Sequence, residues 1–391
     1  MRPSAFAFGF LALRSRPSVR LTGCQPVRGA VVQQQHASRR HVLLVDPASP
    51  CNVRVPTASG GYQVTVRHGI SDTELEEVLP SFDAVVVRSA NRITRRMLVA
   101  SPRVAIVGRA GSGVDNIDLQ AASELGVPVV NAPTGNAGSV AELVLGLLLG
   151  LSRSIPSAHE TMRRGEWAKK DFTGRTLNGK ILGIVGFGSV GRAVTRLAVA
   201  FGMVVLLAEG FRLLSDPGGD PEKRSPPPRR ETDAKELGVI LPPLPLHELL
   251  SKVDFLSVHC PLTADTMGLV SERELALMKP SAVVINAARG GVVDEKALLH
   301  ALEEGRLGGA ALDVFTSEKA PTEAHVTTIC RLPNVLCTPH IGGSTEEAGE
   351  RVLSEVCGAV MDFFEGTLPP SKIVNGDPDM ELRLTRVRNS L

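Results

Sequence analysis

The chain has 391 residues, which is long for one domain and comfortable for two. Apolar residues make up 43% and charged residues 21%, so the composition is that of a globular protein and excludes a disordered chain. A net charge of +2 and an aromatic content of 4% argue against a basic, base-stacking nucleic-acid binder. Six scattered cysteines without a C-x-x-C pair argue against a disulfide scaffold.

Residues 1–40 differ in composition from the rest of the chain. They contain seven arginines and no Asp, Glu or Lys, with Ser, Ala and Gln among the other residues. This composition is typical of a mitochondrial or plastid transit peptide, with a cytoplasmic protein as the alternative. No apolar run reaches the ~18 residues of a membrane span, so we expect no membrane partner.

From residue 41 onward, short β-branched runs alternate with helical patterns. Strands are predicted at 41–46, 62–66, 84–88, 104–108 and 127–130, with helices such as 72–79 and 116–125 between them. Continuous apolar strands separated by helices predict a parallel α/β sheet. The alternation starts again at 180–188, so two α/β units of roughly 100 and roughly 200 residues are expected.

Two segments lack this pattern. Residues 211–240 contain five prolines and two adjacent glycines and have no apolar period, so we expect a mobile surface loop. Residues 377–391 are expected to form a short tail.

A glycine-rich turn follows the apolar strand predicted at 181–185. Gly186, Gly188 and Gly191 form a G-x-G-x-x-G pattern, and apolar residues then recur at helical spacing. The three glycines permit the tight turn, the approach of pyrophosphate and close helix–strand packing, respectively, which predicts dinucleotide binding. Glu209 ends the next strand, where an acidic residue accepts the ribose hydroxyls and favours NAD over NADP.

Three later strands each end close to a polar residue. Strands predicted at 282–285, 309–315 and 335–336 precede Arg289, Glu318 and His340. Ligands of open α/β sheets bind at the carboxyl ends of strands, so these side chains are candidates for one cleft. A histidine supported by a carboxylate moves protons, and an arginine grips a carboxylate, as hydride transfer at C2 of a 2-hydroxy acid requires.

Four possible zinc ligands also occur in this part of the chain. His325, Cys330, Cys337 and His340 lie close in sequence, but their spacing fits no standard site, and no metal is predicted.

Longer motifs resemble one enzyme family over about residues 41–376, the D-isomer-specific 2-hydroxyacid dehydrogenases, and within it the members that oxidise phosphoglycerate. The motifs occupy residues 109–118, 131–136, 165–170, 177–180, 259–263, 286–294, 311–315 and 338–348. The resemblance implies two Rossmann-like doubly wound domains. A substrate-binding domain (41–139 and 342–376) would be interrupted by an NAD-binding domain (140–341), with a hinge and dimer helix at 140–151.

The same resemblance implies roles for individual residues. It assigns catalysis to Arg289, Glu318 and His340. Cofactor contacts are expected, with the glycines of the turn included, at Ser112, Gly186, Gly188, Ser189, Val190, Gly191, Glu209, Cys260, Ala287, Asp313, Gly342 and Gly343. Substrate contacts are expected at Arg88, Arg109 and Asn131.

The expected activity is NAD-dependent oxidation of 3-phospho-D-glycerate to 3-phosphohydroxypyruvate, the first step of phosphorylated L-serine biosynthesis, by a homodimer or homotetramer. The alternatives are a glyoxylate/hydroxypyruvate reductase or D-lactate-type dehydrogenase, an NAD-binding corepressor-like protein, and a catalytically idle relative. No C-terminal regulatory domain, and no feedback inhibition through one, is expected.

Overall fold

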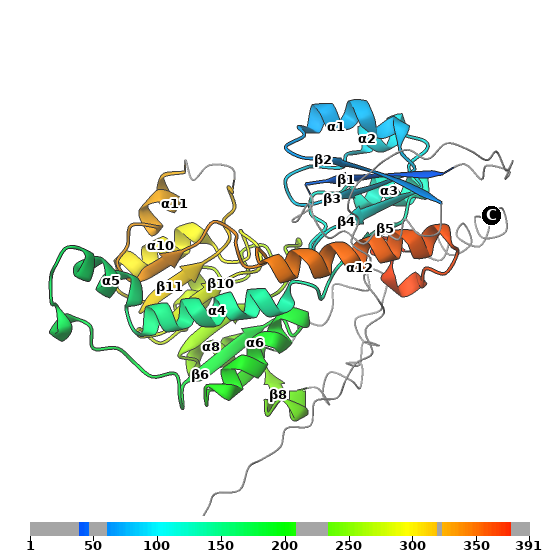
Figure 1. Ribbon diagram of the computed structural model, residues 1–391. Helices are drawn as coiled ribbons and strands as arrows, with labels where there is room; N and C mark the ends of the chain where they lie inside the picture. The colour runs from blue at the N-terminus through cyan, green and yellow to red at the C-terminus, as the bar shows by residue number, and fades with distance from the viewer. Residues whose placement is uncertain (1–38, 47–60, 209–233, 319–322, 377–391) are drawn as a thin grey trace, which may run out of the picture. The chain divides into compact units, whose positions relative to one another are not determined.

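The computed structural model describes residues 39–46, 61–208, 234–318 and 323–376 (Figure 1). The expected transit peptide, except for its last two residues, and the expected tail therefore lie outside the described residues. The described residues form two parallel sheets, of five and seven strands, with helices between most consecutive strands. This arrangement confirms the predicted α/β fold class.

The first sheet has the strand order β2-β1-β3-β4-β5, and all of its neighbouring strands are parallel. Its strands are β1 (Arg40–Val45), β2 (Tyr62–Arg67), β3 (Ala84–Val87), β4 (Ile106–Arg109) and β5 (Val129–Asn131), and its helices include α1 (Asp72–Val78), α2 (Arg95–Ala100) and α3 (Leu119–Leu125). Every residue of β3 is buried, as expected for a central parallel strand covered on both faces. Helix α3 begins three residues later than predicted because Asp118 caps it, accepting a hydrogen bond from the N–H of Ala121.

The second sheet has the strand order β12-β11-β10-β9-β6-β7-β8, and its neighbouring strands are also parallel. Its strands are β6 (Ile181–Val185), β7 (Val204–Ala208), β8 (Ile240–Leu244), β9 (Phe255–Val258), β10 (Val283–Asn286), β11 (Gly309–Leu312) and β12 (Val335–Cys337). Its helices include α6 (Ser189–Ala200), α8 (Leu246–Lys252), α9 (Glu272–Leu275), α10 (Glu295–Glu303) and α11 (Ala324–Ile329). The strand order reverses between β6 and β9, and such a switch point is where open α/β sheets bind ligands.

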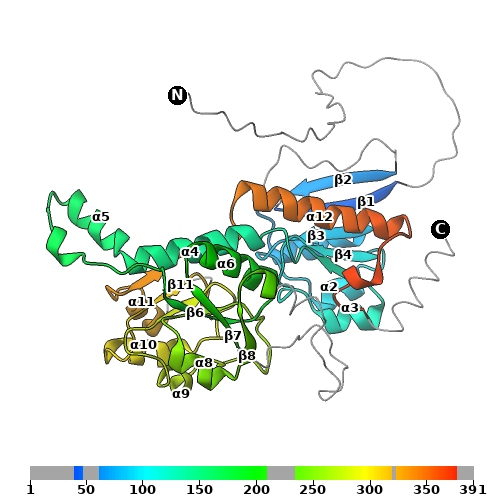
Figure 2. The ribbon, with the colours of Figure 1, turned by 90° about the horizontal axis from the view of Figure 1, so that it is seen from below.

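Two long helices connect the parts of the chain that form the two sheets. Helix α4 (Ala137–Ser152) follows the first sheet but buries its apolar side chains in the core of the second. Helix α12 (Glu346–Phe364) follows the second sheet and packs on the first (Figure 2). Val356 of α12 lies so close to Gly108 that a Cβ on Gly108 would be 2.5 Å from its Cγ1. The predicted domain boundaries stay a prediction, which this packing supports.

The predicted loop at 211–240 extends too far. Residues 209–233 lie outside the described residues, but Ala234 and Val239 are only 1% and 8% exposed and belong to the core of the second sheet. Strand β8 then begins at Ile240 and carries Pro242 and Pro243 on the edge of the sheet. Proline is tolerated there because an edge strand leaves some N–H groups outside the ladder, and the two prolines weaken the apolar pattern by which a strand is predicted from sequence.

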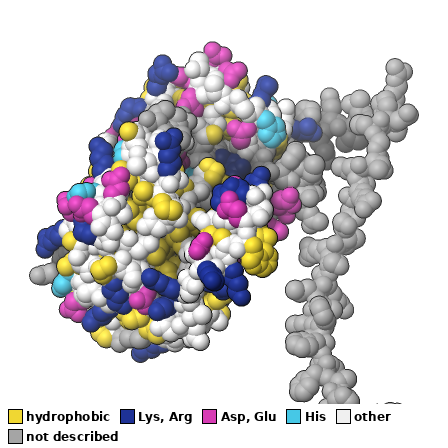
Figure 3. Space-filling view, turned by 90° about the vertical axis from the view of Figure 1, so that its left-hand side faces the viewer, with side chains coloured by type: hydrophobic (Ala, Val, Ile, Leu, Met, Phe, Trp, Pro, Cys, Tyr) yellow, Lys and Arg dark blue, Asp and Glu magenta, His cyan; other side chains and the backbone are white. Residues whose placement is uncertain are grey.

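Within the described residues, no single helix is long and apolar enough to span a membrane. Helices α4 and α5 (Ile155–Arg163) reach that length and composition only as a pair, across a bend of 64°. The described residues also contain no group of three or more His, Cys, Asp or Glu side chains able to hold a metal. On the face drawn in Figure 3, Lys and Arg side chains are interspersed with acidic ones.

Candidate active site

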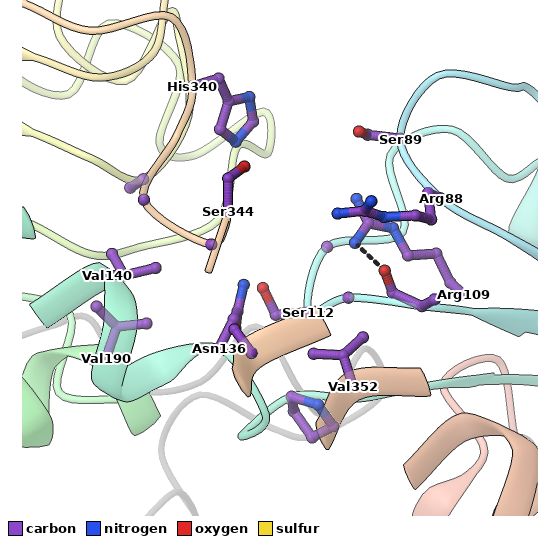
Figure 4. Close-up of a pocket in the computed structure, with 18 of the residues that line it drawn as sticks. Arg88, Ser89, Arg109, Ser112, Asn136, Val140, Val190, His340, Ser344 and Val352 are labelled. Atoms are coloured by element: carbon purple, nitrogen blue, oxygen red, sulfur yellow. Dashed lines mark hydrogen bonds between the residues drawn. The ribbon is translucent and has the colours of Figure 1, made fainter. Parts of the chain in front are cut away.

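A cavity of about 500 Å³ lies where strands of both sheets end (Figure 4). We call the lining residues that end or follow β3 and β4 the first-sheet wall, and those that follow β6 and β9 to β12 the second-sheet wall. Of the residues proposed from sequence, the cavity is lined by Arg88, Arg109, Ser112, Gly188, Ser189, Val190, Cys260, Ala287, Arg289, Asp313, Glu318, His340, Gly342 and Gly343. The structure therefore brings together the three proposed catalytic residues, two of the three proposed substrate contacts and most of the proposed cofactor contacts.

His340 and Glu318 form a hydrogen-bonded pair in the second-sheet wall. The Nδ1 atom of His340 lies 2.9 Å from Oε2 of Glu318. Because an ionised carboxylate only accepts hydrogen bonds, Nδ1 carries the proton, and in the neutral ring Nε2 is left with a free lone pair. The pair therefore has the arrangement of a general base with an orienting carboxylate.

Asp313 fixes the turn that carries His340. This side chain is 1% exposed, and its carboxylate accepts hydrogen bonds from the backbone N–H groups of Ile341 and Gly342, each at 2.8 Å, and from the Thr338 hydroxyl at 2.5 Å. The turn needs this support because His340 has a φ of +54°, in the left-handed region that side chains rarely adopt. Asp313 thus lines the cavity and also determines where His340 lies.

Arg289 connects the two walls. Its Nε donates to Oδ2 of Asp115 at 2.7 Å, and its Nη1 donates to the carbonyl of Ala288 at 2.6 Å. A Cβ on Gly113 would lie 1.5 Å from its Nη2, so only glycine at that position leaves room for the guanidinium. Hydrogen bonds from Nε and Nη1 therefore fix the Arg289 side chain, and Nη2 lies against the backbone of Gly113 in the first-sheet wall.

Arg109 is a partly buried cation in the first-sheet wall. It lies against Gly111, where a Cβ would be 1.3 Å from its Nη1, and its buried Nε has no hydrogen-bond partner among the described residues. Burial and the neighbouring charges of Arg289 and Arg88 lower the pKa of Arg109 to about 10, although Asp115 opposes the shift. Three guanidinium groups near one cavity favour an anionic ligand, since an anion would relieve both the burial cost and the repulsion.

The glycine turn after β6 has the geometry that a dinucleotide requires. Gly186 has a φ of +97°, and a Cβ there would lie 2.8 Å from the backbone of His259. A Cβ on Gly191 would lie 2.2 Å from the carbonyl oxygen of Gly186, whereas a Cβ on Gly188 would have no atom within 4 Å. Gly188 therefore faces open space at the N-terminus of α6, where N–H groups and the helix dipole favour a diphosphate.

Comparison with known proteins identifies the family. The sequence profile of the D-isomer specific 2-hydroxyacid dehydrogenase, NAD binding domain, matches residues 145–342, which is half of the chain. The chain belongs to this family. It therefore carries the NAD-binding domain of these dehydrogenases, in agreement with the glycine turn and with the cofactor expected from sequence.

Named relatives narrow the comparison within this dehydrogenase family. The D-3-phosphoglycerate dehydrogenase of Rattus norvegicus is 41% identical over 330 residues, which are 84% of this chain and 57% of that protein. The D-3-phosphoglycerate dehydrogenase of Methanocaldococcus jannaschii is 39% identical over 327 residues, covering 84% and 58%. The chain thus spans a little over half the length of these curated relatives.

Solved structures agree on the fold. The D-lactate dehydrogenase from Aquifex aeolicus, complexed with NAD and lactic acid, superposes with a TM-score of 0.70 at 27% identity, covering 86% of this chain and 99% of that one. The TT0316 protein from Thermus thermophilus superposes with a TM-score of 0.69 at 30% identity, covering 84% and 98%.

The remaining residues proposed from sequence lie elsewhere. Glu209 lies outside the described residues, and Gly186 and Gly191 pack the turn from behind rather than line the cavity. Asn131 does not line the cavity, and its Nδ2 donates to the carbonyl of Ser112 at 2.6 Å. Asn131 therefore supports the loop of the first-sheet wall instead of facing the ligand directly.

The second-sheet wall also contains neutral groups. Nε2 of His259 lies 2.9 Å from the Ser257 hydroxyl, and Nδ1 is buried without a hydrogen-bond partner among the described residues. Burial lowers the pKa of His259 to about 4, so the ring is neutral near pH 7. Burial also raises the pKa of the Cys260 thiol to about 11, so this cysteine is a wall group and not a nucleophile.

Sequence reasoning missed several lining residues. They include Ser89, Gly111, Gly113, Asn136, His259 and Ser344. Gly111 and Gly113 flank the proposed cofactor contact Ser112 within the quoted 109–118 motif, and this repeated glycine was the available signal. Asn136 ends the 131–136 motif, and its Oδ1 is buried without a hydrogen-bond partner among the described residues.

Proposed function

We propose that this chain catalyses the NAD-dependent oxidation of 3-phospho-D-glycerate to 3-phosphohydroxypyruvate, the first step of phosphorylated L-serine biosynthesis. The observation that carries the proposal is the position of Arg88, Arg109 and Arg289 around the cavity that holds the His340–Glu318 pair. The name shared by the relatives at about 40% identity supports it. A substrate with both a carboxylate and a phosphate offers enough negative charge for three guanidinium groups.

In the proposed reaction, the glycine turn at the N-terminus of α6 would hold NAD, which would supply the hydride acceptor for C2 of the substrate. His340 takes the proton of the C2 hydroxyl at Nε2, because its Nδ1 is held by Glu318. Glu318 then stabilises the imidazolium with its negative charge and keeps the ring oriented. The C2 hydroxyl thus becomes a carbonyl, and the proton that the hydroxyl loses is on His340.

The arginines divide the substrate between them in this proposal. Arg289 binds the carboxylate and orients the adjacent C2, since its guanidinium is fixed by Asp115 and Ala288. Arg109 and Arg88 bind the phosphate from the first-sheet wall. The fixed position of Arg289 favours catalysis because the side chain is already ordered. Only the substrate then loses freedom of movement on binding.

A second candidate is a reductase or dehydrogenase of unphosphorylated 2-hydroxy acids. It is favoured by the superposition on the D-lactate dehydrogenase described above and on a glyoxylate reductase from Paecilomyes thermophila, with a TM-score of 0.71 at 26% identity. Such an enzyme would use the same His340–Glu318 pair and Arg289. The two candidates differ in what Arg88 and Arg109 contact.

The test is an initial-rate assay of the full-length chain with 3-phosphoglycerate, D-glycerate and D-lactate, each with NAD and with NADP. We expect the highest kcat/KM for 3-phosphoglycerate with NAD. Equal kcat/KM for D-glycerate would overturn the phosphorylated substrate in favour of the second candidate. Cofactor binding without turnover of any 2-hydroxy acid would favour a binding protein.

Three further features belong to the proposal. The cofactor is NAD rather than NADP, the working enzyme is a homodimer or homotetramer, and the arginine-rich N-terminus directs it to a mitochondrion or plastid. Light scattering at several protein concentrations tests the oligomer. Import of the full-length chain into isolated organelles, compared with a variant whose N-terminal arginines are replaced by glutamine, tests the location.

A further inference from the structure

A buried carboxylate outside the catalytic pair contacts the segment that carries Glu318. Glu295 opens helix α10 and is only 6% exposed. Its Oε1 accepts hydrogen bonds from the backbone N–H of Thr316 at 2.6 Å and from the Thr316 hydroxyl at 2.8 Å. Thr316 precedes Glu318 by two residues, so Glu295 fixes the backbone from which the Glu318 side chain projects.

The same segment packs against the backbone next to Arg289. A Cβ on Gly290 would lie 2.1 to 2.4 Å from the backbone atoms of Phe315 and Thr316. Helix α10 begins five residues after Gly290, so one stretch of chain carries Arg289, touches Thr316 through Gly290 and holds Thr316 through Glu295. A displacement of Thr316 would therefore alter the positions of Arg289 and Glu318 together.

The second oxygen of Glu295 faces a histidine on another helix. Oε2 is buried and accepts no hydrogen bond from the described residues, but Nε2 of His325 lies 3.4 Å away. The His325 side chain is 15% exposed, and its Nδ1 lies 3.5 Å from Oε2 of Glu323. A buried carboxylate oxygen is costly without a polar neighbour, and the His325 ring is the polar group that faces this oxygen.

We propose that Glu295 is a positioning residue that acts through Thr316 to hold Glu318 in hydrogen-bond contact with His340, with His325 beside its second oxygen as a further support. The inference rests on the proposed dehydrogenase function. Glu295 touches no reacting atom in that function, since it is separated from His340 by the Thr316 segment and by Glu318. Its importance comes from geometry, because a shift of about 1 Å in a catalytic group lowers turnover by up to roughly 10²-fold.

The test uses near-isosteric variants of the full-length chain. Glu295→Gln removes the charge, Thr316→Val removes the hydroxyl donor and Thr316→Ser keeps it. Glu303→Gln, an exposed glutamate on the same helix, is the matched control. The measurements are kcat and KM for NAD and 3-phosphoglycerate, the pH profile of kcat, and hydrogen–deuterium exchange of residues 314–318 in the ligand-free protein.

We expect Glu295→Gln and Thr316→Val to lower kcat by roughly 10- to 10²-fold with little change in KM for NAD. The pH profile of kcat should differ from that of wild type, because the hydrogen bond between Glu318 and His340 is disturbed. Amides 314–318 should exchange faster. Thr316→Ser and Glu303→Gln should behave as wild type, and His325→Gln should give the same changes at smaller size.

The outcomes separate this inference from the proposed function. If the wild-type chain does not oxidise 3-phosphoglycerate, the proposed function fails, and the exchange of residues 314–318 still tests the positioning. Wild-type exchange and an unmoved pH profile in Glu295→Gln would overturn the inference even if kcat fell. Wild-type behaviour of His325→Gln would remove that residue from the proposal.

Discussion

The two walls of the cavity solve different physical problems. In the second-sheet wall, His340, Glu318 and Asp313 form hydrogen bonds to one another or to their own turns. In the first-sheet wall, Arg109 and Arg88 are neighbouring cations, and the Nε of Arg109 has no partner among the described residues. The difference teaches that the second-sheet wall is organised before a ligand arrives, whereas the first-sheet wall still requires an anion.

The largest effect expected from this comparison is on the organised wall. We predict that His340→Gln lowers kcat by roughly 10² to 10⁴-fold, because the general base is lost. The dissociation constant of NAD, measured by protein fluorescence or calorimetry, should stay close to wild type, since the glycine turn is untouched. His300→Gln, an exposed histidine on α10, should change neither value. An unchanged kcat in purified His340→Gln would remove the catalytic assignment.

The second prediction concerns the wall that requires an anion. Arg109→Gln should weaken binding of 3-phosphoglycerate by about 2 to 5 kcal/mol, as for other truncated buried charge pairs. The loss should appear in KM more than in kcat, in contrast to His340→Gln. The control is Arg95→Gln, where an exposed arginine pairs with Glu124 away from the cavity. An equal loss for D-glycerate and 3-phosphoglycerate would contradict phosphate binding by Arg109.

The third prediction concerns His259, whose ring is neutral in the folded protein near pH 7. The folded-state pKa of His259 is lowered to about 4, against the 6.5 of the free side chain. Between these values the unfolded chain binds the proton and the folded chain does not, so stability is lost as the pH falls from 6.5 toward 4. The loss is at most about 3 kcal/mol, since His259 lies at the cavity surface.

Denaturant unfolding of wild type and His259→Asn between pH 7 and pH 4 measures this loss. The free energy of unfolding should fall less steeply in the variant, because asparagine takes up no proton. His300→Asn is the control and should keep the wild-type slope. Parallel curves for wild type and His259→Asn would contradict the assignment of a neutral, buried ring.

The sequence predicts the second-sheet wall better than the first. The turn after β6 can be recognised in the sequence because local backbone geometry requires its glycines. Arg289, Glu318 and His340 can be recognised because each follows a strand of the sheet. The contacts of Gly111 and Gly113 with Arg109 and Arg289 depend on side chains whose paths the sequence does not reveal.

Long-range contacts account for the other misses. The carboxylate of Glu295 accepts a hydrogen bond from Thr316, 21 residues away in the chain. The spacing of apolar residues does not predict such a contact. The N–H of Val129 donates to Oδ1 of Asn375 across 246 residues, and Nδ2 of Asn375 donates to the hydroxyl of Ser123 on α3 across 252 residues. Strand β8 was missed for a different reason, since two prolines within it weaken the apolar pattern that marks a strand.

The smallest predicted effects come from two variants that compare the walls directly. Gly188→Ala and Gly113→Ala each add one methyl group, the first to the second-sheet wall and the second to the first-sheet wall. Gly188→Ala should weaken NAD binding roughly tenfold, about 1.4 kcal/mol, by filling the space that the diphosphate needs. Its melting temperature should be unchanged, since a Cβ there has no atom within 4 Å. Gly113→Ala should leave NAD binding intact but displace Arg289, whose Nη2 lies 1.5 Å from the new Cβ position.

Gly113→Ala should therefore raise the KM for 3-phosphoglycerate and lower kcat, each by a few-fold to roughly tenfold. Calorimetric titration with NAD and initial rates with 3-phosphoglycerate separate the two variants. A loss of NAD affinity in Gly113→Ala equal to that in Gly188→Ala would mean that both glycine turns serve the cofactor. Opposite responses would assign the backbone donors of one turn to NAD and the guanidinium groups beside the other to the substrate.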